Sequence, residues 1–325
     1  MLLTRKMFRP IVAILLAASA VAAHAEDAYP NRPVRLIVPL GAGSATDVLA
    51  RVIAESLTHE LKNTFVVENK AGAGGAIGAD FVAKAKPDGY TLGFFHSSVL
   101  SASAAINPKL PYDPRKDFTP LGIAASNPIV LAVPVNSRFK TLEELIDAAK
   151  KEPGKYTSGF IGVGSHSQFN LELLNIVSGA KITAIPYAGG TGPLLTGLLG
   201  NQIDSASALW AAFSAQVAAG KLRLLATAAP LKELPDVPTF ASKGYERANM
   251  EVFSVLMGPP HLPKEIADQL ARALERSVKD PKVAQKIENL GFLVRYGSPQ
   301  ELSTKVAEET KLLTEVAEKV GIKVE

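Results

Sequence analysis

The chain has 325 residues, no cysteine and a formal net charge of +4, from 35 Lys and Arg against 31 Asp and Glu. The lack of cysteine excludes a disulfide framework, a thiolate metal site, a cysteine nucleophile and a lipidated cysteine anchor. A net charge this close to neutral does not support binding to nucleic acid or to an anionic membrane surface.

The first 25 residues are typical of a secretory signal peptide. Basic residues lie between positions 5 and 9, an apolar stretch covers 11–23, and Ala23-His24-Ala25 matches an A-x-A cleavage site. We expect cleavage after Ala25; an uncleaved N-terminal anchor is the alternative. Cleavage removes three basic residues and no acidic one, so the net charge falls from +4 to +1. An exported chain without cysteine fits a soluble protein of a bacterial periplasm.

The first predicted unit is a strand, a loop of small residues and a helix. Val34 to Val38 is a short apolar run, as in a buried parallel strand, and the apolar spacing after Thr46 is helical. Such a loop presents N–H groups at the positive end of a helix, which suits a carboxylate or phosphate. Glycines that only permit a tight turn are the alternative. The candidate ligand contacts here are Gly41, Ala42, Gly43, Ser44, Thr46 and Asp47.

Two further strands are predicted over Thr64–Glu68 and Thr91–Phe95. The glycines at 72, 74 and 78 between them do not have the spacing of a dinucleotide fingerprint, so we interpret them as packing glycines. Ser97 and Ser98 follow the third strand at its carboxyl end, where α/β sheets place their ligands. They are therefore added to the candidate contacts.

The middle of the chain repeats this design. Its predicted strands are Ile129–Pro134, Tyr156–Ile161, Ile182–Pro186, Ile203–Ser207 and Leu222–Thr227. A second small-residue loop ends in Ser165-x-x-Gln168, a capping box that begins a helix. It supplies the candidates Gly164, Ser165, His166 and Gln168.

A third glycine loop, from Tyr187 to Gly192, adds Tyr187 and Gly189 as candidates. Trp210 follows a strand end and is the last candidate, although a lone tryptophan is more often part of a core. After an extended segment at Glu251–Met257, we predict that the remainder is helical. Proline and capping signals at 280–281 and 298–301 begin its helices. The whole pattern predicts an α/β protein whose two lobes point helix N-termini into one cleft.

Several motifs occur in a fixed order over nearly the whole mature chain. They include Tyr29-Pro-x-Arg-Pro33, Thr46-Asp-x-x-Ala-Arg51, Pro87-Asp-Gly-Tyr-Thr-Leu92 and Leu234-Pro-Asp-Val-Pro-Thr239. Together they resemble the Bug family, the substrate-binding proteins of tripartite tricarboxylate transporters.

This resemblance implies a two-lobed type II periplasmic-binding-protein fold. Residues 26–124 and 250–325 would form lobe 1, residues 125–249 would form lobe 2, and two strands would cross between them near 122–125 and 249–256. The loops at 41–46 and 164–168 would hold a small organic carboxylate. The implied partners are membrane transporter subunits. We expect a monomer with no cofactor and no metal.

The departures from the family pattern fall at the implied cleft. The first loop has Gly41-Ala-Gly-Ser44 in place of Pro-Pro-Gly-Gly, Ala188 replaces a lysine, and Gln168-Phe169 replaces His-Leu. The identity of the carboxylate is therefore hard to carry over from the family.

Three alternatives to a transport receptor are a hydrolase, a metal-binding protein and a ligand sensor. An exported hydrolase using Ser165 and His166 is disfavoured, because adjacent residues at a helix start rarely face each other and G-x-S-x-G is absent. The mature histidines, His59, His96, His166 and His261, lack metal-ligand spacing and read as surface or loop residues. A ligand-sensing protein that signals to a membrane partner uses the same bound state as a transport receptor, so this alternative stays open.

Overall fold

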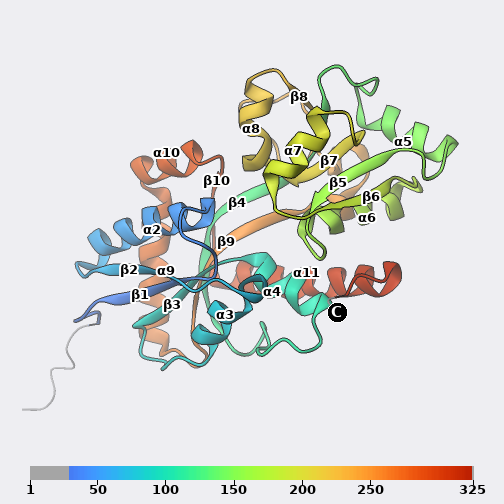
Figure 1. Cartoon of the computed structure of the whole chain (residues 1–325). Coiled ribbons are helices and arrows are strands. Elements are labelled where there is room, and N and C mark those ends of the chain that lie inside the picture. Colours follow the sequence, from blue (N-terminus) through green and yellow to red (C-terminus); the bar gives the residue numbers. More distant parts are fainter. Residues whose placement is uncertain (1–28, 324–325) are drawn as a thin grey trace, which may run out of the picture.

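One long strand, β4 (Thr119–Pro134), runs through both lobes of this two-lobed α/β protein (Figure 1). In the computed structural model, which describes residues 29–323, residues 119–128 of β4 pair antiparallel with β9 (Glu251–Gly258). Residues 129–134 pair with two strands of the other lobe. The predicted signal peptide lies outside the described residues.

Lobe 1 is built on a sheet in the order β2-β1-β3-β9-β4, with β10 also beside β4. β1 pairs parallel with β2 and β3, and the pairings of β9 and β10 are antiparallel. Its remaining elements are β1 (Val34–Val38), β2 (Phe65–Asn69), β3 (Thr91–His96), β10 (Leu293–Gly297), α2 (Ala45–Leu61), α3 (Ala76–Ala83), α4 (Ser97–Ile106), α9 (Lys264–Lys279), α10 (Pro281–Asn289) and α11 (Pro299–Val320), with a 3-10 turn, η1 (Ala73–Gly75).

Alternation along β1 assigns the two faces of this sheet. Val34, Leu36 and Val38 pack in one buried cluster with residues of α2, α9 and α10. Ile37 points the other way and packs with residues of α3, α4 and α11. Because successive side chains of a strand point to opposite faces, Arg35 shares the face of Ile37.

Lobe 2 continues from β4 through β7, β5 and β6, and β8 also pairs with β4. β5 is parallel to both β6 and β7. Its elements are α5 (Leu142–Lys151), β5 (Thr157–Ile161), α6 (His166–Ser178), β6 (Thr183–Tyr187), α7 (Thr191–Leu199), β7 (Ser205–Leu209), α8 (Trp210–Ala218) and β8 (Leu222–Thr227), followed by the 3-10 turns η2 (Ala241–Lys243) and η3 (Glu246–Ala248).

The last helix, α11, contacts the cores of both lobes. Leu302 and Val306 near its start pack with Ile37 in lobe 1. Leu313 and Val316 near its end pack in the cluster formed by α5 and α6. α11 thus joins the lobes in addition to the crossing strands. The boundaries at 124/125 and 249/250 stay a prediction.

The main differences from the sequence prediction concern strands with distant partners. The tail is not wholly helical, because Leu293–Gly297 forms β10 and pairs with β4 at Ala125 and Ser126. The predicted strand at 129–134 is only the second half of β4. The prediction of a packing role is confirmed for Gly78, where an added Cβ would lie 2.8 Å from the Lys70 carbonyl oxygen and 2.9 Å from the Pro39 Cα.

Candidate ligand-binding site

The first candidate loop lies between β1 and α2 and is closed by a serine cap and a returning side-chain hydrogen bond. The Ser44 hydroxyl accepts the N–H of Asp47 at 3.2 Å, and Asp47 Oδ2 accepts the N–H of Gly43 at 2.9 Å. Gly43 has φ +80°, a conformation that favours glycine. The loop is therefore held by its own side chains in the shape that begins the helix.

The second loop, between β5 and α6, repeats this arrangement in the other lobe. The Ser165 hydroxyl accepts the N–H of Gln168 at 3.3 Å, and Gln168 Oε1 accepts the N–H of Gly164 at 2.7 Å. Gly164 has φ +77°. The serine half of the predicted capping box is confirmed, whereas the return bond of Gln168 comes from Gly164, one residue before the N-cap. Each loop thus places one serine cap at a helix N-terminus, and the two caps have matching geometry.

Asp47 is fully occupied by protein partners. It is buried, and its Oδ1 accepts bonds from Arg51 at 3.1 Å and from Asn69 at 2.9 Å. Burial alone would raise the pKa of this carboxyl, but the bonds from Arg51, the Gly43 N–H and Asn69 outweigh burial and lower the pKa. Asp47 thus positions the loop as an ionised carboxylate and has no lone pair directed at a ligand.

Each loop leaves donors at the start of its helix. The first amides of a helix have no acceptor inside it. In α2 these are the N–H groups of Ala45 and Thr46, and in α6 those of His166 and Ser167. Within the described chain they donate no backbone bond outside their helix. These four amides thus lack a backbone acceptor and stand at two positive helix ends, the arrangement that favours an anion.

Helix α4 contacts both loops, through the residue before its start and through its last residue. His96, the residue before α4, shares a hydrogen bond through Nε2 with the Thr46 hydroxyl at the start of α2. Burial, and to a smaller extent the nearby His166, lowers the pKa of His96 to about 4. At neutral pH His96 is therefore an uncharged side chain between the two loops.

His166 is held from the other side by α11 and α4. Its Nε2 lies 3.0 Å from Glu309 Oε1, and Glu309 Oε2 accepts the Ser101 hydroxyl at 2.5 Å. The ring is 3 % exposed, and its Nδ1 has no partner among residues 29–323. The prediction that His166 is a surface or loop histidine is wrong, because Glu309 offers a buried partner that local sequence does not reveal.

Gly164 brings the second loop into contact with α4. A Cβ at this position would lie 2.1 Å from Cδ1 of Ile106, the last residue of α4. Only a residue without a side chain allows this approach, so the loop and the helix pack directly.

The family model for the tripartite tricarboxylate transporter family receptor, TctC, matches residues 49–322, which cover lobe 2 and most of lobe 1. The chain belongs to this family. It is a solute-binding protein of the periplasmic-binding type, and the predicted Bug resemblance and two-lobed fold are confirmed.

Three relatives match this chain over almost their full length. BugT of Bordetella pertussis is 31% identical over 317 residues, covering 96% of this chain and 97% of BugT. MatC from Rhodopseudomonas palustris with bound malate is 31% identical with a TM-score of 0.72, covering 89% of this chain and 99% of MatC. A second R. palustris protein, with adipate, is 29% identical with a TM-score of 0.76, covering 91% of this chain and 99% of that one.

The other candidates of this TctC-family chain are the two serines at the start of α4, the exposed residues of the first loop, and the third loop with Trp210. Ser97 is buried and accepts the N–H of Phe253 at 3.1 Å, so it fixes α4 to β9. Ser98 is partly exposed one residue later. Of the exposed residues of the first loop, Gly41 and Ala42 carry no side-chain group that can hydrogen-bond, so only their backbone can contribute to binding.

The third loop and Trp210 are placed by packing within lobe 2. A Cβ at Gly197 would lie 2.2 Å from the Tyr187 hydroxyl oxygen, so this ring lies against α7. Gly189 has φ +86° and is exposed in the turn before α7. Trp210 begins α8 and is 7 % exposed in the cluster of α7 and α8. Their contact with a ligand stays a prediction.

Sequence reasoning missed Glu309, Ile106 and the role of His96. Glu309 is 143 residues from His166 and lies on a helix that reads as scaffold. His96 ends β3, and its position at the carboxyl end of a strand is the signal that could have found it.

Two negative findings concern residues 29–323. No group of three or more His, Cys, Asp or Glu side chains is arranged there to hold a metal ion. No helix in that range has both the length and the apolar character to cross a bilayer.

Proposed function

We propose that this protein captures a small organic carboxylate between the loops at 41–46 and 164–168 and delivers it to the membrane subunits of a tripartite transporter. The observation that carries this proposal is the pair of matching loops with unused amides at two helix N-termini. One related structure contains bound malate and another is of a protein with adipate; both are carboxylates, which supports the same ligand class.

The two helix ends are not electrically equivalent. The first turn of α2 contains Asp47, whereas the first turn of α6 contains no acidic residue of its own; the carboxylate beside it, Glu309 of α11, already accepts bonds from Ser101 and pairs with His166. An ionised Asp47 already occupies the positive end of α2, with its charge balanced in part by Arg51. We therefore assign the principal carboxylate of the ligand to the α6 loop, near Ser165 and His166. The amides of Ala45 and Thr46 would act as neutral donors opposite it.

Binding is expected without turnover and with closure of the lobes over the ligand. A melting-temperature screen of aliphatic and aromatic mono- and dicarboxylates tests this, because a ligand that binds only the folded state raises the melting temperature. Solution scattering with a confirmed ligand should show a smaller radius of gyration. Recovery of a chemically altered ligand after long incubation would disprove pure binding.

Export is part of the same proposal. Cleavage after Ala25 and release into the periplasm as a monomer would leave the mature chain free to meet its membrane partners. Mass spectrometry of the exported protein tests the cleavage, and retention of Met1 would contradict it.

A ligand-sensing role remains the alternative. Both roles use the same bound state, so affinity alone does not separate them. Uptake of labelled ligand by cells that carry or lack the membrane subunits does: uptake that requires both components supports transport, and unchanged uptake without them favours sensing.

A further inference from the structure

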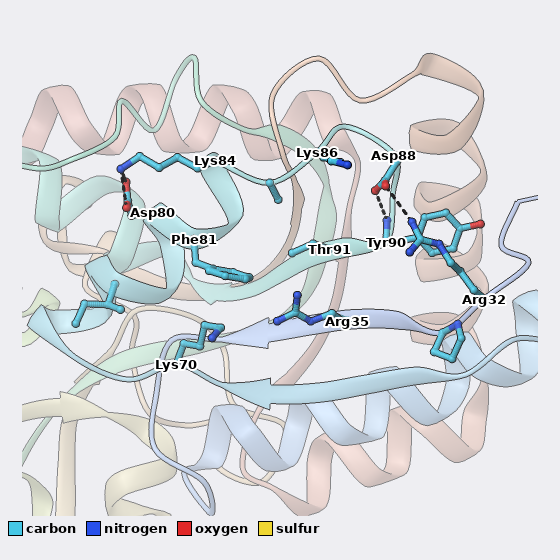
Figure 2. A pocket seen from close by; sticks show the side chains of 13 residues that line it. Arg32, Arg35, Lys70, Asp80, Phe81, Lys84, Lys86, Asp88, Tyr90 and Thr91 are labelled. Carbon is cyan, nitrogen blue, oxygen red and sulfur yellow. Dashed lines mark hydrogen bonds and ion pairs between the residues drawn. The ribbon is translucent and has the colours of Figure 1, made fainter.

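A hollow of about 800 Å³ lies on the flank of lobe 1, between α3 and the strands β1 and β3 (Figure 2). It does not include any residue of the two ligand loops. The basic residues that line it are Arg32, Arg35, Lys70, Lys84 and Lys86, against two acidic ones, Asp80 and Asp88. An inference about this surface therefore goes beyond the carboxylate proposal and does not depend on it.

The acidic residues of the hollow are already neutralised. Asp80 pairs with Lys84 at 2.7 Å, and Asp88 pairs with Arg32 at 3.1 Å; both pairs are drawn in Figure 2. Outside the lining, Glu68 holds Arg35 at 2.7 Å.

Two positive charges remain. Within residues 29–323, no carboxylate oxygen lies within 4.0 Å of Lys70 or Lys86. Lys70 follows β2, and Lys86 belongs to the connection between α3 and β3, so the two charges come from different walls of the hollow.

The same surface exposes large apolar side chains. Ile77 is 55 % exposed, Val66 is 43 % exposed and Phe81 is 36 % exposed. Val66 is the parallel register partner of Arg35, so both side chains stand on the face of the sheet that bears the hollow. Lys70 Nζ lies 4.4 Å from the centre of the Phe81 ring, which places one of the free charges against an apolar wall.

The fold leaves this face uncovered for a simple reason. α3 has only 8 residues and covers Ile37; it reaches Arg35 only through Phe81, whose ring centre lies 5.1 Å from the Arg35 guanidinium carbon, and Val66 stays 43 % exposed. β2 is also the edge strand of the sheet, so its outer backbone groups have no strand partner. Exposed apolar groups beside an open edge are typical of surfaces that bind another protein segment.

We propose that this hollow docks an extended acidic segment of a partner protein, with carboxylates against Lys70 and Lys86 and apolar side chains against Ile77, Val66 and Phe81. A small inorganic anion would use the two lysines but not the apolar wall. A flat anionic membrane surface does not fit into a concave hollow, whereas an extended peptide can enter it. A peptide chain matches both the charge and the apolar contacts.

The test uses fluorescence anisotropy with labelled decapeptides of alternating Glu and Leu, and of alternating Gln and Leu as the neutral analogue. We expect the Glu peptide to bind about ten-fold more tightly or better, with affinity that falls as salt rises. The double variant Lys70→Glu/Lys86→Glu should lose about ten-fold or more of this affinity. The matched control is Lys150→Glu/Lys311→Glu, which makes the same charge change at two exposed positions away from the hollow and should bind like wild type.

A third variant, Ile77→Ser, tests the apolar contact and should weaken both peptides. Melting temperatures of all variants check that the fold is retained. The proposal is overturned if the Glu and Gln peptides bind equally, or if the two double variants behave alike. It is also overturned if vesicles of phosphatidylglycerol bind through Lys70 and Lys86 while neither peptide does.

Discussion

Asp47 and Gln168 make the same hydrogen bond in the two lobes: each accepts, through a side-chain oxygen, the N–H of the glycine four residues before it, at 2.9 and 2.7 Å. One acceptor is an ionised carboxylate and the other a neutral amide. The two loops therefore have the same shape but a different charge at the helix N-terminus. This difference decides which loop is better suited to a second negative charge.

Replacing Gln168 by glutamate tests this difference. Gln168→Glu keeps an acceptor for the Gly164 N–H and favours α6 through its dipole, so stability should be kept or raised by about 0.5 kcal/mol. Carboxylate affinity should fall about ten-fold, because a negative charge then stands beside the assigned carboxylate position. Calorimetry and chemical denaturation of the variant measure both effects.

Gln168→Ala is the control for that variant. It removes one neutral hydrogen bond, which costs about 1 kcal/mol of stability, and adds no charge. If both variants weaken ligand binding equally, the loss comes from loop geometry and the charge argument is wrong.

The glycines at 43 and 164 form a matched pair for alanine substitution. Both have positive φ, so each alanine costs about 1–2 kcal/mol in backbone strain. A Cβ at Gly43 meets nothing within 4 Å, whereas one at Gly164 meets Ile106. Gly164→Ala should therefore cost about 1–3 kcal/mol more than Gly43→Ala in chemical denaturation.

Ile106→Val removes the methyl group that the new Cβ would strike. The double variant Gly164→Ala/Ile106→Val should be destabilised by less than the sum of its two single variants. Simple additivity would show that the loop and α4 do not press on each other at this point.

The lowered pKa of His96 predicts that the stability of the fold depends on pH within a specific window. Its folded pKa is about 4, below the value of about 6.5 expected in the unfolded chain. Between these values the unfolded state binds more protons, so the free energy of unfolding rises with pH. The stability is complete above about pH 6.5 and is lost as the pH falls toward 4, by up to roughly 3 kcal/mol at 1.36 kcal/mol per pKa unit.

Denaturation of wild type and His96→Gln at several pH values measures this contribution. The variant should show a flatter dependence over the same window, and NMR titration of the ring gives the pKa directly. A His96 ring that titrates near its ordinary value would contradict the partly buried, neutral side chain described between the loops.

Alanine variants of Ser165 and Ser298 distinguish a serine that only caps a helix from one that also binds ligand. Both hydroxyls accept the N–H three residues later, so each change to alanine should cost about 1 kcal/mol of stability. Only Ser165 lies in a proposed ligand loop, so only Ser165→Ala should also weaken ligand binding. Equal ligand affinity in the wild type and Ser165→Ala would place that hydroxyl outside the site.

Local patterns predicted the elements whose determinants are local. The apolar runs 34–38 and 222–227 correspond to β1 and β8 without a shift, and the capping signals at Ser165 and Ser298 are confirmed by their hydrogen bonds. The repeated strand–glycine loop–helix units indicated two lobes, and the family resemblance supplied the two strands that cross between them.

The features that the sequence did not predict depend on contacts between residues far apart in the chain. β10 exists because it pairs with β4, and no turn or alternation in Leu293–Gly297 marks it as a strand. The burial of His166 depends on Glu309, and the fit of Gly164 depends on Ile106. Such contacts are set by how α4 and α11 pack between the lobes, and a single sequence carries no local record of that packing.

The most direct test of the central claim compares a matched carboxylic acid and its primary amide by calorimetry at low and high salt. The loops carry no Lys or Arg, so the ionised group must be held by backbone amides, hydroxyls and helix N-termini. Hydrogen bonds to a charged group contribute about 1.5–3 kcal/mol each. The acid should therefore bind at least about ten-fold more tightly than the amide, with little change between the two salt concentrations. An amide that binds as tightly as its acid would contradict carboxylate recognition by these loops.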